Sequence, residues 1–133
     1  MKLHVFNPEH DISLAQNNPN QTPSRAALQI RNDLDFIPYI WAAQGDVVLV
    51  NDVMKAYEAV EKLRLKDKNV SFIDADILEK YSDEIDAILP WGWDCAIKEN
   101  LKRLGISQTL LPSSKQLSEI RNLNNRKASI NWL

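Results

Sequence analysis

The sequence of 133 residues contains one cysteine, three glycines and two histidines, and each scarcity argues against a class of protein. Cys95 cannot form an internal disulfide, which agrees with a reducing compartment. Three glycines are too few for a glycine-rich phosphate loop, and neither GxGxxG nor GxxxxGK[ST] occurs. A metal centre would need more ligands than His4 and His10 supply. The sequence therefore disfavours a stand-alone nucleotide enzyme, and we expect no resident metal.

The chain also lacks long apolar runs and basic blocks. No apolar run approaches the roughly 18 residues of a membrane helix, and the start MKLHVFNPEH has no apolar signal-peptide core. Sixteen Lys and Arg against eighteen Asp and Glu give a formal charge of −2, without a basic cluster for nucleic acid. We therefore expect a cytoplasmic protein with neither a membrane nor a nucleic-acid partner.

The chain has the composition of an α/β domain and the alternation of strand-like and helix-like runs that such a domain shows. Hydrophobic residues make up 44% and charged residues 26%, as in an ordinary globular protein. Short apolar runs alternate with longer amphipathic runs, which is typical of βα units around a parallel sheet. Strands are expected at 2–7, 46–50, 70–73 and 86–89, with a weaker fifth at 106–111. The sequence thus predicts a three-layer fold with a mostly parallel sheet of four to five strands.

Polar and small residues mark the expected helix ends. Thr22 and Pro23 would open a helix reaching 35, Asn51 would cap the next, and Asp94 would begin a helix that Gly105 ends. Ser113 or Ser114 would open a last helix. The apolar residues of the stretch 125–133 start another amphipathic run without any helix-ending signal. We therefore expect the chain to continue beyond Leu133.

A long polar segment, FNPEHDISLAQNNPNQTPS, follows the first strand. Ligands of open parallel sheets bind at the carboxyl ends of the strands, where the connecting loops gather. The candidate substrate-binding residues of this segment are Asn7, Glu9, His10, Asp11 and Asn17. The alternative is a loop that satisfies its own hydrogen bonds, with Asp11 capping a short turn at 12–16.

His10 beside Asp11 suggests three alternatives. The pair is a metal site, a general base oriented by a carboxylate, or a hydrogen-bonded histidine without catalytic function. Cys95 at a helix start is a nucleophile served by His10, or a small buried residue. His4 lies within a strand and is expected to be structural. None of these patterns identifies a catalytic residue.

The second unusual segment is Trp91, Gly92, Trp93 and Asp94, after the fourth strand. The two indole rings flank a glycine and can form an apolar wall for a ligand, or they can cover the helix that follows. Asp94 is a good helix cap, although an anion can also bind at such a helix start. With the first segment, these residues define a predicted substrate site of Trp91, Trp93, Asp94 and the five polar residues.

Three stretches give the chain a family resemblance. FNPEHDISLA, TPSRAALQIRNDLDFIPYIWAAQGDVVLV and LPWGWD resemble the start of an uncharacterised bacterial family related to ATP-grasp enzymes. The tail LPSSKQLSEIRNLNNRKASINWL is similar to the junction where a pre-ATP-grasp domain passes into the nucleotide-binding part. The resemblance implies a Rossmann-like pre-ATP-grasp domain at 1–112 and the helical start of an ATP-grasp region at 113–133.

The resemblance also implies an activity and its cofactors. Relatives of this family are ligases that activate a carboxylate as an acylphosphate before an amine or thiol attacks. Their later domains hold ATP and magnesium, while the pre-ATP-grasp part contacts the substrate. Arg126 and Lys127 would lie near the entry to the missing C-terminal ATP-grasp domain. Because the ATP-binding lysines and magnesium carboxylates are not in this sequence, it is not expected to ligate alone, and no cofactor is expected in it.

Three functional hypotheses result. The first is the substrate-side domain of an ATP-grasp-type carboxylate ligase, inactive alone, with a small-molecule substrate. The second is a binding module for a small metabolite or a protein, of the same fold but without ATP-dependent activity. The third is a small hydrolase that uses His10 with Asp11 or Cys95. A homo-oligomer formed through the exposed C-terminal helix is a further expectation.

Overall fold

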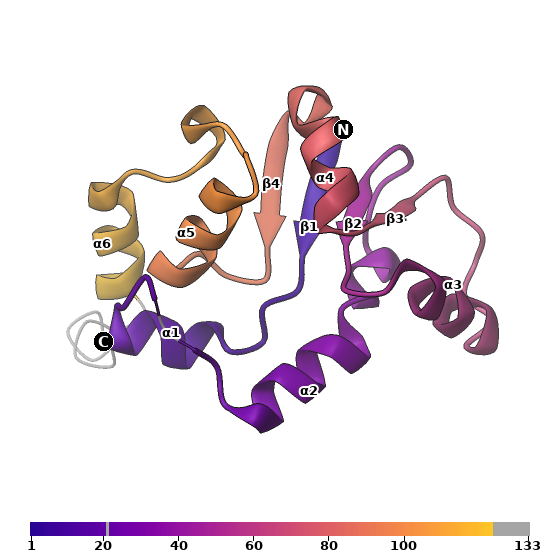
Figure 1. Ribbon diagram of the computed structural model, residues 1–133, viewed down its shortest axis with the longest axis horizontal. Helices are drawn as coiled ribbons and strands as arrows, with labels where there is room; N and C mark the ends of the chain where they lie inside the picture. Colours follow the sequence, from indigo (N-terminus) through magenta and orange to yellow (C-terminus); the bar gives the residue numbers. More distant parts are fainter. Residues whose placement is uncertain (21, 124–133) are drawn as a thin grey trace.

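The computed structural model describes residues 1–20 and 22–123. The expectations for 125–133, including Arg126, Lys127 and the end of the chain, lie outside this part. The described chain forms a four-stranded, all-parallel sheet with helices around it, so the predicted α/β class is confirmed (Figure 1). The strands are β1 (Lys2–Val5), β2 (Val47–Leu49), β3 (Ser71–Ile73) and β4 (Ala87–Pro90), in the order β3-β2-β1-β4.

The described residues contain six α-helices and three short 3₁₀ helices besides the strands. The α-helices are α1 (His10–Gln16), α2 (Arg25–Leu34), α3 (Val53–Lys62), α4 (Ala75–Tyr81), α5 (Cys95–Arg103) and α6 (Ser114–Leu123). The 3₁₀ helices are η1 (Ile37–Ile40), η2 (Ser82–Glu84) and η3 (Gln108–Leu110).

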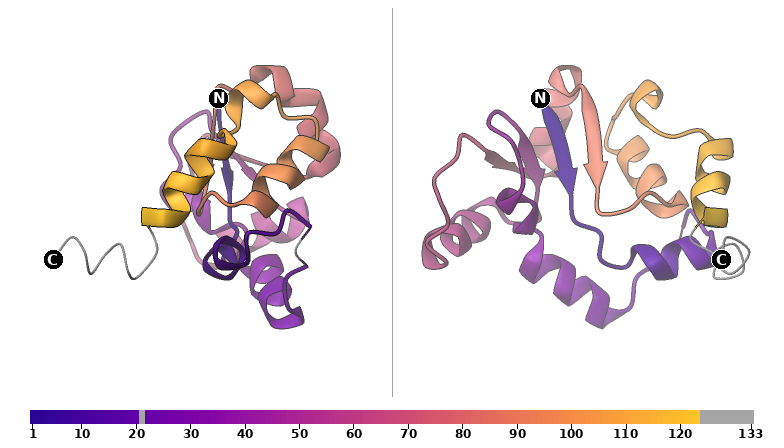
Figure 2. Two further views of the ribbon diagram at one scale, coloured as in Figure 1. Left: turned by 90° about the vertical axis from the view of Figure 1, so that its left-hand side faces the viewer. Right: turned by 180° about the vertical axis from the view of Figure 1, so that it is seen from behind.

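Alternation of side chains along the strands produces three layers. Leu3, Val5 and Ile88 lie in a core cluster with residues of α4 and α5 on one face of the sheet. Val48 and Phe72 lie in a second cluster with residues of η1 and α3 on the opposite face. Successive side chains of a strand point to opposite faces, so both faces of the central strands need a helical cover. Figure 2 shows the helices around the sheet from two further sides. The arrangement is consistent with a Rossmann-like three-layer fold.

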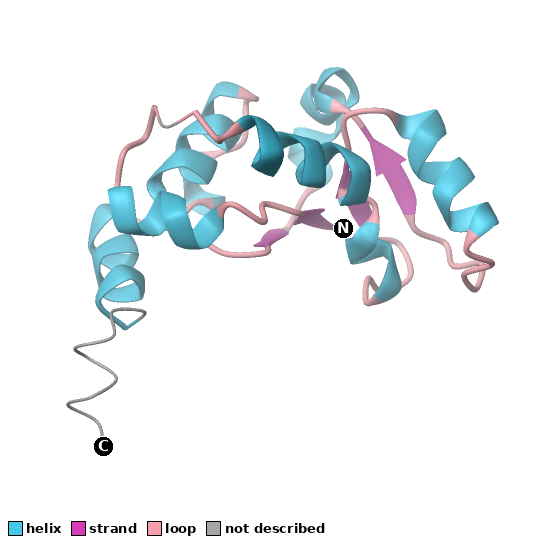
Figure 3. Ribbon diagram, turned by 90° about the horizontal axis from the view of Figure 1, so that it is seen from below, coloured by secondary structure: helices cyan, strands magenta, loops and turns pink. Residues whose placement is uncertain are grey.

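The direction of the connections reverses between β1 and β4. The chain passes from β1 to β2 and β3 on one side, then crosses back to β4 on the other side of β1. The loops that follow β1 and β4 therefore lie side by side at this point, where parallel α/β proteins place their ligands. Helices α1 and α2 lie across the carboxyl edge of the sheet, seen from below in Figure 3. Helix α2 buries no residue and borders this edge instead of covering a face.

The weaker fifth strand expected at 106–111 is wrong. The segment contains η3 instead, and Ile106 and Leu111 are buried in the core cluster that includes α5. Gly105, with φ of 91°, turns the chain after α5. Because its apolar side chains are needed over the sheet face, the segment does not pair with the edge of β4.

Three expected helix caps differ from those in the structure. Ser24, not Thr22, caps α2, and Asp52, not Asn51, caps α3. Both true caps have extended backbones and accept a hydrogen bond from the residue three positions later, as a cap must. Asp11 is an exposed residue of the first turn of α1 and caps nothing.

Two expected caps are present. The Asp94 carboxylate accepts a hydrogen bond from the Ile97 amide at 2.8 Å and caps α5. Ser113 caps α6 by accepting from the Gln116 amide at 3.1 Å, and Gln116 Oε1 accepts from the Ser113 amide at 2.7 Å. This reciprocal pair is a capping box, which fixes the start of α6.

A buried pair of His4 in β1 and Asp46, the residue before β2, joins the two strands. His4 Nε2 lies 2.8 Å from Asp46 Oδ2, and the Ala43 and Lys2 amides donate to the same carboxylate at 3.1 and 3.3 Å. Burial raises the pKa of Asp46, but the hydrogen bonds from His4, Ala43 and Lys2 outweigh it, and the pKa is lowered. The charged carboxylate therefore stabilises the fold, and His4 has the structural position expected of it.

Replacing Asp46 by Asn is expected to lower the free energy of unfolding at pH 7 by about 2 kcal/mol, since hydrogen bonds to a buried charge are lost. A carboxyl whose pKa is depressed by folding contributes its stability above the unfolded pKa, here 3.8, and loses it as pH falls through the folded value. Urea denaturation between pH 3 and 7 checks this. If the difference in free energy of unfolding between the unmodified protein and the Asp46→Asn variant does not shrink below about pH 4, the prediction is contradicted.

Candidate functional site

Asn7 ties the loop after β1 to the loop after β4. Its side chain is 1% exposed. The amide nitrogen donates to Gly92 O at 2.8 Å, and the amide oxygen accepts from Gly92 N at 3.3 Å. The Trp91 amide also donates to Val5 O at 2.8 Å. The two segments that the sequence analysis placed at the carboxyl edge are thus in direct contact there.

Asp94 is the centre of a buried polar network below this contact. It is 2% exposed, and its Oδ2 lies 3.1 Å from His10 Nδ1 and 3.5 Å from Asn7 Nδ2. His10 is therefore oriented by Asp94 and not by its neighbour Asp11. Gly92 lies against the imidazole ring so closely that a methyl group in its place would overlap the ring. Asn7, His10 and Asp94 bind one another, and this network holds the two loops in register.

Glu9 extends the network toward α2. Its Oε1 accepts from Arg31 Nη1 at 3.0 Å, and both side chains are largely buried. With Asn7, Ser13 and Asp94, this pair lines a space of about 20 Å³. A space of this size holds a single water molecule, not a metabolite. The predicted polar residues therefore surround no substrate-sized cavity of their own.

The two tryptophans of the second segment pack against different residues. Trp91 is 57% exposed, and its ring meets Phe6 edge to face at 5.4 Å and Trp41 at 6.0 Å between centroids. Trp93 is half-buried and packs against the core cluster that contains Ile88. The prediction of one apolar wall made by both rings is therefore wrong, and Trp93 has the alternative role of covering the core.

Asn17 and Cys95 form a separate contact at the end of α1. Asn17 ends α1 with a left-handed backbone, φ 51°, and its side-chain oxygen accepts from Cys95 Sγ at 2.9 Å. Cys95 is partly exposed. The Cys95 thiol is thus bonded to Asn17, while the His10 ring is bonded to Asp94. The nucleophile-and-base arrangement of Cys95 with His10 is not formed.

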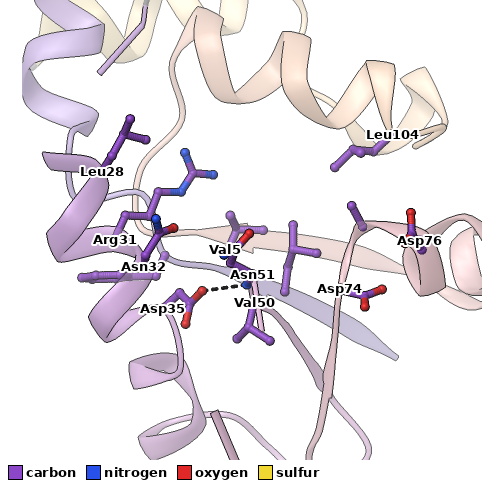
Figure 4. Close-up of a pocket in the computed structure, with 13 residues that line it drawn as sticks. Val5, Leu28, Arg31, Asn32, Asp35, Val50, Asn51, Asp74, Asp76 and Leu104 are labelled. Carbon is purple, nitrogen blue, oxygen red and sulfur yellow. Dashed lines mark hydrogen bonds between the residues drawn. The ribbon is translucent and has the colours of Figure 1, made fainter. Parts of the chain in front are cut away.

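A substrate-sized cavity lies beside this network, at the carboxyl ends of β1, β2 and β3. It has a volume of about 440 Å³, within the usual range for small-molecule sites, and we call it the edge cavity. Figure 4 shows α2 on one side, with Arg31 and Asn32, and the start of α4 opposite, with Asp74 and Asp76. The lining residues are Val5, Phe6, Leu28, Arg31, Asn32, Asp35, Leu49, Val50, Asn51, Asp74, Ala75, Asp76 and Leu104.

Carboxylates dominate the polar lining of the edge cavity. Asp35, Asp74 and Asp76 come from two sides of it, whereas the one lining cation, Arg31, is already paired with Glu9. Amide groups of Asn32 and Asn51 add neutral donors and acceptors. The apolar lining includes Val5 and Leu49 of the strands and Leu104 at the end of α5. The cavity therefore favours a small ligand that carries a positive charge and hydrogen-bond donors.

Asp35 is the most buried of the three carboxylates, at 8% exposure. Burial raises the pKa of Asp35, and this outweighs the hydrogen bond from the Asn51 amide at 2.8 Å and the charges of Lys55 and Arg31. Burial makes the charged form of the Asp35 carboxyl unfavourable, and a cation bound beside it would stabilise that charged form. The physical state of Asp35 therefore agrees with a cationic ligand.

Replacing Asp35 by Asn is expected to raise the stability of the unliganded protein at pH 7, because the amide carries no charge to desolvate and still accepts from Asn51. For a carboxyl whose pKa is raised by folding, stability falls as pH rises from the unfolded value, 3.8, through the folded value. The advantage of the variant should vanish at pH 3. Paired thermal melts at both pH values test this, and equal melting points at pH 7 would refute it.

Sequence analysis missed most residues of the edge cavity. The sequence predicts Asn51 only as a helix cap, and Arg31 falls within the helix expected to reach residue 35. Asn51 and Asp74 come directly after the strand runs 46–50 and 70–73, so the rule applied to the first and fourth strands would have found both. No sequence pattern indicates that Asp35 lines the edge cavity, because its position depends on how α2 lies across the edge of the sheet.

None of the helices in residues 1–20 and 22–123 has the length and apolar character to span a bilayer. The same residues contain no group of three or more His, Cys, Asp or Glu side chains placed to hold a metal ion. No protein-family model, curated protein or solved structure matches the chain.

Proposed function

We propose that this chain binds an amine-bearing small molecule in the edge cavity, as the substrate-side domain of an ATP-grasp-type carboxylate ligase. The observation that carries the proposal is the edge cavity itself, about 440 Å³ at the carboxyl ends of β1, β2 and β3. The domain does not catalyse ligation alone. Its contribution is to select and orient the substrate whose amine attacks an activated carboxylate.

The lining of the edge cavity supports an amine in particular. An ammonium group placed between Asp35 and Asp74 would pair with carboxylates on both sides of the cavity. Such a cation offsets the desolvation cost that raises the pKa of Asp35. A substrate carboxylate or hydroxyl would meet Arg31 and Asn32 on α2. An amino acid has this distribution of charge, and a diamine supplies its ammonium part alone.

The link to a ligase rests on the resemblance of FNPEHDISLA and LPWGWD to an ATP-grasp-related family. Within the proposal, ATP and magnesium bind to domains that follow this chain, and the location is cytoplasmic. The network of Asn7, His10 and Asp94 positions the loops around the edge cavity and takes no part in bond making. Association of copies through α6 remains a prediction, testable by sedimentation.

Thermal stability with matched compounds tests the binding. We expect 1,4-diaminobutane and L-lysine to raise the melting temperature, since a ligand at 100 times its Kd stabilises the folded state by about 2.7 kcal/mol. Succinate and 1,4-butanediol, which lack the amine, should have no effect. Replacing Asp74 and Asp76 by Asn should abolish the increase, because Asn retains the cap of α4 but not the charge.

The matched control replaces the exposed Asp67 and Asp83 by Asn, with the same change in net charge. This control should keep the response to amines. Equal responses in the two double variants, or no response of the unmodified protein to any amine, would count against the edge cavity as the site.

The ligase assignment has its own test. A gene that continues past Leu133 into a region with a nucleotide-binding lysine and paired acidic metal ligands supports it. ADP release by the full-length protein with ATP, magnesium, an amine and a carboxylate, but not by residues 1–133 alone, is the expected result. A stop codon after Leu133 together with amine binding would favour the module without ATP-dependent activity.

A further inference from the structure

A second cavity, of about 480 Å³, lies between α5 and α6. It shares no lining residue with the edge cavity. Its charged residues are Lys98, Glu99 and Lys102 of α5, and Ser113, Ser114 and Gln116 line the side formed by α6. Figure 2 shows α5 and α6 from two sides. We call this space the interhelix cavity.

The interhelix cavity has a net positive lining. Lys98 and Lys102 are four residues apart on α5, so their ammonium groups lie on one face of the helix. Within residues 1–20 and 22–123, neither lysine forms an ion pair. Glu99 also lines the cavity, but its carboxylate is 3.6 Å from Arg103 and its charge is offset there. Two lysines thus face the cavity without a counter-charge.

The α6 side adds uncharged donors to these two cations. Ser114 lines the cavity, and the capping box of Ser113 and Gln116 fixes the chain there. Leu111 and Leu117, both buried, form the apolar part of the lining. The cavity therefore combines a cationic wall, hydroxyl groups and an apolar floor, with more volume than a single inorganic anion fills.

We propose that the interhelix cavity binds a small molecule through its phosphate group, with Lys98 and Lys102 as the principal contacts. A phosphate dianion offers oxygens to two ammonium groups at once, and lysine is a common phosphate ligand in proteins. Ser114 donates a further hydrogen bond, and the remainder of the molecule lies against Leu111 and Leu117. This site is separate from the edge cavity, and its existence does not depend on the proposed ligase function.

NMR titration of backbone amides with inorganic phosphate and with pyrophosphate, at constant ionic strength, tests the proposal. We expect saturable shifts at Lys98, Lys102 and Ser114 in the unmodified chain. The variant K98Q/K102Q should bind about tenfold more weakly, which corresponds to the loss of two partly exposed ion pairs. The variant K98R/K102R keeps both charges and should retain binding.

The control variant K62Q/K80Q removes two exposed lysines from α3 and α4, with the same change in charge. It should bind pyrophosphate as the unmodified chain does. Shifts spread evenly over surface lysines, or identical titrations of K98Q/K102Q and K62Q/K80Q, would overturn the proposal. Because both lysines are at least partly exposed, K98Q/K102Q is expected to fold, and its spectrum reports this directly.

Discussion

Replacing Asp94 by alanine is expected to lower the free energy of unfolding by about 3 kcal/mol. The carboxylate caps α5 through the Ile97 amide and also holds His10 and Asn7 at the carboxyl edge. Alanine removes the cap and deprives the buried Asn7 amide and the largely buried His10 ring of a hydrogen-bond partner. For a chain of this length the loss corresponds to a fall in melting temperature of about 10 °C, measurable by circular dichroism.

A matched control separates the cap from the network. Asp52 caps α3 by accepting from the Lys55 amide at 3.1 Å, and it is exposed. Replacing Asp52 by alanine removes a cap alone and should cost about 1 kcal/mol. If the Asp94 and Asp52 variants lose equal stability, the buried network has no stabilising role, and the account of how the loops are held together is wrong.

Replacing Gly92 by alanine is expected to cost about 2 to 3 kcal/mol, as overpacking of a tight site does. The backbone of Gly92 is outside the left-handed region, so the need for glycine is a matter of space. An added methyl group would overlap the His10 ring, and the hydrogen bonds to Asn7 prevent the backbone from moving aside. The ring must then leave Asp94. Urea denaturation of the variant measures the cost.

A double-mutant cycle identifies the His10 ring as the cause. With His10 replaced by alanine, the methyl group at position 92 has room, so the second substitution should cost less than about 1 kcal/mol. The single His10 variant should lose about 1 kcal/mol, from the bond to Asp94. Additive losses in the double variant would mean that Gly92 is needed for a reason other than the ring.

Much of the fold could be predicted because the local signals agree with one another. Apolar runs such as DVVLV, at 46–50, have no helical periodicity and lie between turn residues, and they form β2 in a parallel sheet. The strand predicted at 106–111 is wrong because a short apolar run is compatible with either an edge strand or a turn that covers the core. Its apolar residues pack in the core cluster with α5 and the sheet, and this tertiary packing has no signature in the local sequence.

The candidate site could be predicted only in part. The meeting of the loops after β1 and β4 followed from the parallel topology, and Asn7 and Gly92 join them as closely as the rule suggests. The sequence could not show that Asn7 and Asp94 satisfy one another and leave no substrate-sized space. The edge cavity forms because α2 lies across the strand ends, and α2 has the pattern of any amphipathic helix.

The most direct test of amine binding in the edge cavity is an NMR titration of backbone amides with 1,4-diaminobutane and with L-lysine. The account predicts saturable shifts at the edge cavity, at Arg31, Asp35, Asn51 and Asp74, with 1,4-butanediol causing none. Amine-induced shifts absent from these four residues, or spread without saturation over the acidic surface, would contradict it.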